Sequence, residues 1–298
     1  MSQDSPSSNE ALLAALHHQL ERIANALETA TGTAPVSFPE EASAYRWERR
    51  QGPFGGGRLV AIENPALIRF DDLRNVDRQR QAIERNTRQF VTGRPANNVL
   101  LTGARGTGKS SLVKACLQAF QDEGLRLIEI DKEDLADLRQ VVALIRQRPE
   151  RFILFCDDLS FEEGEGGYKA LKTALDGSLT GAAANMLIYA TSNRRHLLPE
   201  KMSENLEARP GENGEIHPGD TTEEKVSLSE RFGLWLSFYP FTQDDYLHAV
   251  DQWLHYFGFN DAEAAALRDE AVLWSRTRGA RSGRIAWQFA RDQAGRRG

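Results

Sequence analysis

Eight consecutive residues near the end of the first third of the chain constrain its fold more than any other feature. They match the pattern G-x-x-x-x-G-K-[S/T], and they lie between an apolar run at 98–101 and a helical pattern. Glycines allow the backbone to curl so that successive N–H groups point inward, where they can hold phosphate oxygens. The order of strand, loop and helix therefore predicts a phosphate-binding loop. Its residues are Gly103, Ala104, Arg105, Gly106, Thr107, Gly108, Lys109 and Ser110.

The residue types of this loop predict that it holds the phosphates of ATP together with Mg²⁺. The helix that begins near Lys109 adds the positive end of its dipole to the attraction for phosphate. Lys109 would bridge the terminal phosphate oxygens, and Ser110 would ligate Mg²⁺ through its hydroxyl. We expect the nucleotide contacts to continue as far as Ser111.

A second motif, a pair of acidic residues, follows the apolar run at 152–156. Five apolar residues in a row predict a strand that is buried on both faces, and Asp157 and Asp158 come directly after it. Acids at the carboxyl end of a parallel strand point into the crevice where such sheets bind ligands. Asp157 is the predicted partner of Mg²⁺, and Asp158 would orient or deprotonate the attacking water. The alternative is that these acids merely cap a helix or sit in a loop.

The remaining pattern predicts an α/β fold with a parallel five-stranded sheet flanked by helices. Apolar runs alternate with helical patterns, which is typical of a parallel sheet covered on both faces. The first helix is expected at 76–92. The strands are expected at 98–101, 125–130, 152–156, 186–190 and 234–238.

The composition and periodicity along the chain predict that it divides into three parts, 1–60, 61–241 and 242–298. The first would be an extension made of an amphipathic helix at 11–29 and a linker at 31–58. The second would be the nucleotide-binding domain, with a polar exposed insertion at 200–227. The last would be a small helical lid with helices at 242–257, 261–277 and 282–294.

The composition limits the possible partners and compartments. The net charge of −6 gives no electrostatic support for binding nucleic acid. Seven arginines follow residue 275 against the single acid Asp292, and a solvated helical face and a nucleotide or polyanion role are about equally favoured. The sequence has no apolar run long enough to span a membrane and no signal peptide at its start, so we expect a cytoplasmic protein. Two isolated cysteines, Cys116 and Cys156, fit buried thiols in a reducing compartment.

The order of these motifs resembles that of the AAA+ ATPases. The strand at 186–190 leads to Asn193, which matches the polar "sensor 1" of that superfamily and would hold the lytic water or the γ-phosphate. The segment 229–234 is similar to an arginine-finger segment, so Arg231 would reach the nucleotide of a neighbouring subunit. The segment 278–286 is similar to "sensor 2", with Arg284 as the first candidate and Arg281 as the alternate. More narrowly, residues 60–298 resemble a bacterial family of predicted AAA+ ATPases of unassigned function.

Each of these positions also has a plainer interpretation. Asn193 could cap the next helix, Arg231 could form a surface ion pair, and Arg281 and Arg284 could be solvated helix charges. The lid and the segment 68–76 would together recognise adenine.

Two departures from the AAA+ pattern affect the predicted function. The water-activating position usually carries Glu, and Asp158 is one methylene shorter, which implies slower hydrolysis. Threading members carry an aromatic pore loop ahead of the acidic motif, but no aromatic residue lies between Asp131 and Arg151. Tyr168, which comes after the motif, is expected to pack or to lie on the surface.

The resemblance therefore implies Mg²⁺-dependent ATP hydrolysis by a homo-oligomeric ring that remodels a protein or nucleoprotein partner. The alternative is an ATP-binding switch or scaffold with little intrinsic hydrolysis. A small-molecule kinase or a GTPase fits less well, since no N-K-x-D tetrapeptide for reading guanine is present.

Overall fold

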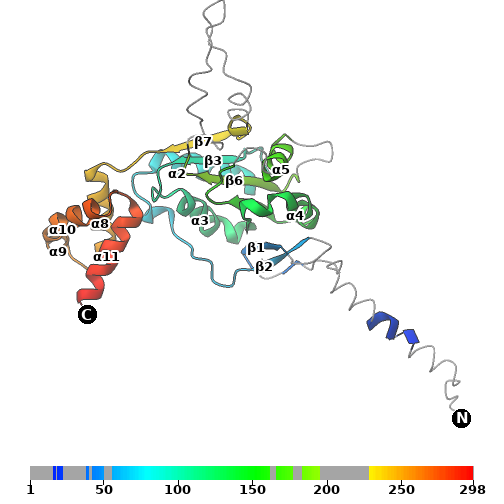
Figure 1. Ribbon diagram of the computed structural model, residues 1–298, viewed down its shortest axis with the longest axis horizontal. Coiled ribbons are helices and arrows are strands. Elements are labelled where there is room, and N and C mark those ends of the chain that lie inside the picture. The colour runs from blue at the N-terminus through cyan, green and yellow to red at the C-terminus, as the bar shows by residue number, and fades with distance from the viewer. Residues whose placement is uncertain are drawn as a thin grey trace, which may run out of the picture.

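The computed structural model describes most of the chain, and a single twisted sheet forms its centre (Figure 1). The described residues are 16–17, 19–22, 38–39, 42–49, 56–161, 166–176, 183–194 and 228–297. The sheet has seven strands in the order β2-β1-β4-β5-β6-β3-β7. The strands are β1 (Ala44–Arg49), β2 (Gly57–Ala61), β3 (Val99–Gly103), β4 (Leu125–Glu129), β5 (Arg151–Cys156), β6 (Met186–Ser192) and β7 (Leu234–Phe238).

The five strands expected from the sequence are confirmed, and all of them run parallel. They are β4, β5, β6, β3 and β7, paired in that order. The expectation of only five strands is wrong, because β1 and β2 form an antiparallel pair and β1 also pairs in parallel with β4. Gly103, the last residue of β3, pairs with Phe238, the last residue of β7, at the carboxyl edge of the sheet, where parallel strands bind ligands.

The linker expected at 31–58 is wrong over residues 44–49 and 57–58, which belong to β1 and β2. Proline and glycine residues around these short strands suggested irregular structure. The strand β1 is held by burial, since Tyr45 and Trp47 are among the largest fully buried side chains. The Trp47 ring lies so close to Gly57 that a Cβ on that glycine would meet ring carbons at 2.4 Å.

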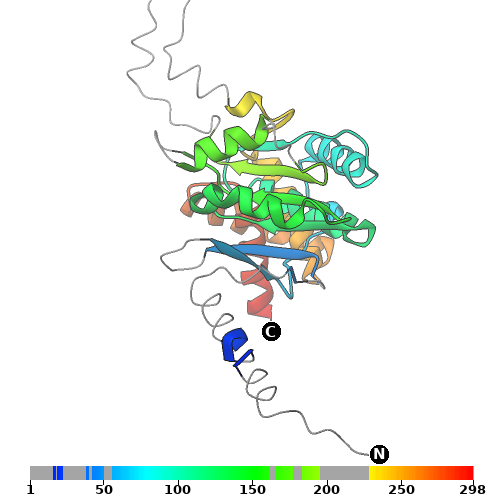
Figure 2. The same cartoon turned by 90° about the vertical axis from the view of Figure 1, so that its right-hand side faces the viewer.

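Helices cover both faces of the sheet, as the parallel topology requires (Figure 2). Successive residues of β3 point to opposite faces of the sheet. Leu100 packs in the hydrophobic core between the sheet and helices α4 and α5, whereas Leu101 packs in the core on the side of α2 and α3. The helices of this part are α2 (Asp77–Val91), α3 (Lys109–Phe120), α4 (Leu138–Ile145) and α5 (Gly166–Leu175). Three short 3-10 helices accompany them, η1 (Phe70–Asp72), η2 (Gln121–Glu123) and η3 (Lys132–Asp137).

The chain after Pro240 forms a separate cluster of helices beside the sheet, as expected (Figure 1). These are α8 (Gln243–Tyr256), α9 (Asp261–Ala266), α10 (Arg268–Thr277) and α11 (Gly283–Arg297). The single helix expected at 261–277 is two helices with a break at Leu267. Helices of this cluster share their own hydrophobic core around Tyr246 and Phe289. The division into 1–60, 61–241 and 242–298 otherwise stays a prediction.

Other expectations concern smaller parts of the molecule. Tyr168 is buried and packs edge to face against Phe161, with ring centroids 5.7 Å apart. Cys116 in α3 and Cys156 in β5 are buried free thiols.

Two expected segments lie largely or wholly outside the described residues. In the N-terminal helix expected at 11–29, only residues 16–17 and 19–22 are described, and they are helical; the insertion at 200–227 lies outside the described residues. Among the described helices, none has the length and apolar character to cross a membrane.

Candidate functional site

The phosphate loop connects β3 to α3 and depends on glycine at three positions. Gly103, Gly106 and Gly108 have φ values of 132°, 75° and 97°, which side chains rarely adopt. A Cβ on Gly103 would lie 1.9 Å from the carbonyl oxygen of Phe238, and a Cβ on Gly106 would lie 2.7 Å from Ser282 Oγ. The glycines therefore allow the loop to pass closely between β7 and the lid.

Lys109 begins α3, and its ammonium group lies at the centre of the loop. Nζ donates hydrogen bonds to the carbonyl oxygens of Gly103 and Ala104 at 2.8 and 2.7 Å. It also donates to Asn193 Oδ1 at 3.0 Å. The side chain is buried, and this burial lowers its pKa, although the Asp157 and Asp158 carboxylates act in the opposite direction. A desolvated ammonium with three acceptors around it is well placed to exchange a carbonyl for a phosphate oxygen.

Ser110 and Asp157 lie together at the predicted metal position. The Ser110 hydroxyl donates to Asp157 Oδ1 at 2.7 Å, so its lone pairs are left to face outward. A hydroxyl beside a carboxylate is an all-oxygen donor set, which is the set that Mg²⁺ prefers. The residues therefore fit the ion, and the roles of Ser110 and Asp157 as its ligands stay predictions.

Asp158 and Asn193 form the next part of the site. Asn193 Nδ2 donates to Asp158 Oδ1 at 2.5 Å, so Asn193 joins Lys109 and Asp158 through its two amide atoms. Asp158 has a left-handed backbone, with φ of 52°, which is uncommon for a residue other than glycine. Arg105 approaches Asp158 Oδ2 at 3.9 Å, but its side chain is 78% exposed, so this ion pair is weak.

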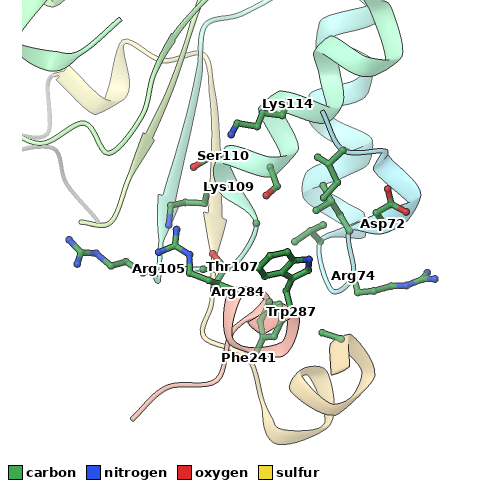
Figure 3. A pocket seen from close by; sticks show the side chains of 18 of the residues that line it. Asp72, Arg74, Arg105, Thr107, Lys109, Ser110, Lys114, Phe241, Arg284 and Trp287 are labelled. Atoms are coloured by element: carbon green, nitrogen blue, oxygen red, sulfur yellow. The ribbon is translucent and has the colours of Figure 1, made fainter. Parts of the chain in front are cut away.

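A cavity of about 660 Å³ extends from these groups towards the lid. Figure 3 shows that the cavity is lined by residues of the phosphate loop, of α11 and of the segment that contains Asp72 and Arg74. One end is charged and contains Lys109, Ser110, Asp157 and Asp158. The other end is apolar, and its side chains are Ile68, Leu73, Val76, Phe241, Ala249, Trp253 and Trp287. A charged end and an apolar end suit the phosphates and the base of one nucleotide.

A hydrogen-bonded clasp holds the lid against the segment predicted to recognise adenine. Gln252 of α8 donates to the carbonyl oxygen of Asp72 at 2.9 Å and accepts from Arg74 Nε at 2.9 Å. Asn75 Nδ2 donates to the carbonyl oxygen of Asp245 at 3.1 Å. The segment and the lid therefore close the apolar end of the cavity together.

Most of the predicted site residues meet at this cavity. Those that line it are Arg105, Gly106, Thr107, Gly108, Lys109, Ser110, Ser111, Asp157, Asp158, Asn193 and Arg284. Gly103 and Ala104 lie behind Lys109 and hold it through their carbonyl groups. The individual roles of these residues stay predictions.

The structure distinguishes between the arginines expected to act on phosphate. Arg284 lines the cavity from α11, whereas Arg281 is not among its lining residues and donates to Gln243 Oε1 at 3.2 Å. Arg231 is also absent from that lining and forms an ion pair with Asp176, which follows α5. Within one chain Arg231 therefore takes part in an ion pair, and its role toward a neighbouring subunit stays a prediction.

Several lining residues were not expected from the sequence. Thr191 lies on β6 two positions before Asn193, which directly follows the strand, and both residues line the cavity. Trp287 lies three positions after Arg284 on α11, which places both on one face of that helix. These spacings were available signals. Lys114 lies four positions after Ser110 on α3, which is a signal of the same kind. Arg74 belongs to the segment 68–76 that was expected to recognise adenine, whereas Gln252 faces the cavity only through the tertiary arrangement.

Known proteins resemble this chain over different lengths. Residues 40–297 match the model of a family described as "Protein of unknown function (DUF815)". A curated relative, the ATP-dependent zinc metalloprotease FTSH 7, chloroplastic, from Oryza sativa subsp. japonica, is 30% identical over 89 residues. That match covers 27% of this chain and 11% of the metalloprotease, so the chain spans a small part of that relative.

Two solved structures are similar to this chain at low sequence identity. The RuvB Holliday junction branch migration motor of Thermotoga maritima has a TM-score of 0.45 and 16% identity, covering 75% of this chain and 63% of that one. The FIGL-1 AAA domain in complex with ADP has a TM-score of 0.48 and 16% identity, covering 78% and 74%. The phosphate loop between β3 and α3, the acids after β5 and the helical lid lie on one α/β sheet, in the order that the sequence predicted. The chain belongs to the DUF815 family.

Proposed function

We propose that this protein binds ATP with Mg²⁺ and hydrolyses it in the cavity between the sheet and the lid. The observation that carries this proposal is the convergence of Lys109, the Ser110–Asp157 pair and the Asp158–Asn193 pair at one end of the cavity. These groups come from α3 and from the residues that directly follow β5 and β6. They supply a cation, an oxygen ligand set and an acid with its orienting amide.

Each group has a chemical task in hydrolysis. Lys109 would bind the terminal phosphate oxygens, and Ser110 would face the metal ion, which neutralises phosphate charge when bound. Asp158 would accept a proton from the attacking water, and Asn193 would hold that water or the γ-phosphate in line. Arg284 would offset charge on the leaving phosphates from the lid side.

We also propose that the protein acts as a homo-oligomeric ring in which Arg231 completes the ATP site of the next subunit. Two observations support this: Arg231 is not among the residues that line the cavity of its own chain, and it lies three residues before β7, paired with Asp176. A trans-acting arginine would stabilise charge in the transition state. Such a ring would use ATP to remodel a protein or nucleoprotein partner.

A second candidate, an ATP-binding switch or scaffold with little hydrolysis, is favoured by one observation. The Asp158 carboxylate is short and already accepts a hydrogen bond from Asn193, with Arg105 nearby. These contacts compete with a water for the same oxygens.

The test is a comparison of ATP binding and ATP turnover in the wild type and in Lys109→Ala. We expect Mg²⁺-dependent turnover that chelation by EDTA abolishes, and the loss of both binding and turnover in the variant. Tight ATP binding without turnover over a range of protein concentrations would favour the switch. Undiminished turnover in Lys109→Ala would exclude the proposed site.

A further inference from the structure

We propose that Thr191 is a positioning residue that holds both acidic residues of the site in place. This inference rests on the proposed Mg²⁺-dependent ATP site, and it assigns a task to a residue that no sequence motif identified. Thr191 lies near the end of β6, is 2% exposed, and lines the cavity beside Asn193.

The Thr191 hydroxyl makes two hydrogen bonds, one as acceptor and one as donor. It accepts from the backbone N–H of Asp158 at 2.9 Å. Its own proton is therefore available to Asp157 Oδ1, which lies 2.5 Å away. One hydroxyl thus connects the carboxylate of the first acid to the backbone of the second.

The backbone of Thr191 adds a third contact to the same turn. The N–H of Leu159 donates to the carbonyl oxygen of Thr191 at 2.7 Å. The turn after β5 is therefore bound to one residue at Asp157, Asp158 and Leu159. Only the first two contacts depend on the hydroxyl, so a change of side chain would remove them and leave the third.

The turn needs this support because of its backbone conformation. Asp158 has a φ of 52°, and such conformations persist where the surroundings over-determine them. The hydrogen bond from Asp158 N–H to Thr191 holds the backbone, and the bond from Asn193 Nδ2 holds the carboxylate. Together they set the direction in which the short Asp158 side chain points.

The same hydroxyl also acts on the metal position through Asp157. Asp157 Oδ1 accepts from both Ser110 Oγ, at 2.7 Å, and Thr191 Oγ1. Two donors on one oxygen fix the rotation of the carboxylate, which in turn fixes the Ser110 hydroxyl. Outer-shell partners of this kind typically change metal affinity or activity by about 10–100-fold when they are removed.

The experiment compares Thr191→Val, which keeps the shape but loses the hydroxyl, with Thr191→Ser, which keeps the hydroxyl. Thr87→Val is the matched control, because Thr87 is a buried threonine on α2 whose hydroxyl contacts Tyr189 away from the cavity. The first readout is the Mg²⁺ concentration that gives half-maximal ATP binding, measured by equilibrium binding without turnover. The second is kcat for ATP at saturating Mg²⁺, and thermal melting checks the fold of every variant.

We expect Thr191→Val to need at least about tenfold more Mg²⁺ and to lose at least about tenfold in kcat, while Thr191→Ser and Thr87→Val stay near the wild type. Equal effects of Thr191→Val and Thr87→Val would overturn the proposal, and so would a Thr191→Val variant with wild-type Mg²⁺ dependence. If Thr191→Val does not fold, a Thr191→Ser variant as impaired as Lys109→Ala would overturn it. A wild type without Mg²⁺-dependent ATP binding would instead contradict the proposed function, so the two failures are distinguishable.

Discussion

Individual residues of the site divide into those that a motif identifies and those that only the fold brings near. The loop residues, Asp157, Asp158 and Asn193 could be predicted because each has a fixed place relative to a strand end. Thr191 could not be assigned a task, because its role depends on hydrogen bonds between β6 and the turn that follows β5. Sequence spacing within one element does not contain that relation between elements.

Asp158 provides the most direct prediction at the scale of one residue. Replacing Asp158 with Asn removes the proton acceptor but preserves the size of the side chain. We expect turnover to fall by about 10²–10⁴-fold, the usual range for general base catalysis, while ATP binding is retained. Steady-state turnover and equilibrium binding measure the two effects separately. A variant that hydrolyses ATP at the wild-type rate would show that Asp158 does not activate water.

The two buried thiols predict a loss of stability at alkaline pH. Burial raises the pKa of both Cys116 and Cys156 from 9.0 to about 12. The unfolded chain therefore loses these protons first, and the free energy of unfolding falls as pH rises from 9.0 toward about 12. Each thiol contributes up to about 1.4 kcal/mol per pH unit in this window.

Urea unfolding at about pH 8 and about pH 10 measures this effect. The double variant Cys116→Ala, Cys156→Ala is the control, and its stability should depend less on pH over the same range. Equal pH dependence of the wild type and the double variant would contradict the assignment to the thiols.

At the scale of elements, the parallel strands and the lid helices were predictable from periodicity, but the β1–β2 hairpin was not. Each hairpin strand is short and lies among proline, glycine and charged residues, which weakens any pattern. Its stability comes from distant contacts: Trp47 is buried and its indole N–H donates to Asp137 Oδ2 at 3.4 Å, and β1 pairs with β4. Long-range pairing of this kind leaves little local signal in a sequence.

The hairpin predicts a stability effect that is independent of the ATP site. Trp47→Ala should lower the free energy of unfolding by about 3–5 kcal/mol, because it removes a fully buried aromatic side chain. Chemical denaturation measures this change, with Arg58→Ala on the exposed side of β2 expected to cost less than about 0.5 kcal/mol. A similar cost for both variants would mean that the hairpin is not part of the folded core.

The lid helix α11 predicts a contribution to nucleotide affinity. Trp287 lines the apolar end of the cavity, and Arg291 lies over its ring at 5.0 Å from the centroid. Stacking of a base on an aromatic side chain contributes about 1–3 kcal/mol, so Trp287→Ala should weaken ATP binding by roughly tenfold or more. Trp287→Phe keeps an aromatic ring and should recover most of the affinity. Equilibrium binding that is unchanged in Trp287→Ala would place the base elsewhere.

At the scale of the whole molecule, the cavity proposed to bind ATP lies between the sheet and the lid. Arginines after residue 275 are mainly engaged within the lid, for example Arg296 with Glu270 and Arg297 with Glu263. These contacts suit a solvated helical face, whereas Arg284 lines the cavity, so neither of the two interpretations left open by the sequence holds for all seven arginines. The subunit interface could not be predicted, because a sequence contains no direct signal for which surface a second copy covers.

The central claim is that two subunits share each ATP site, and subunit mixing tests it most directly. Lys109→Ala subunits would lack a working phosphate loop but keep Arg231, and Arg231→Ala subunits would have the opposite defect. We predict that each variant alone has little turnover and that co-assembled mixtures regain a substantial part of it. Turnover in Arg231→Ala that equals the wild type, or mixtures no more active than their separate components, would contradict the shared site.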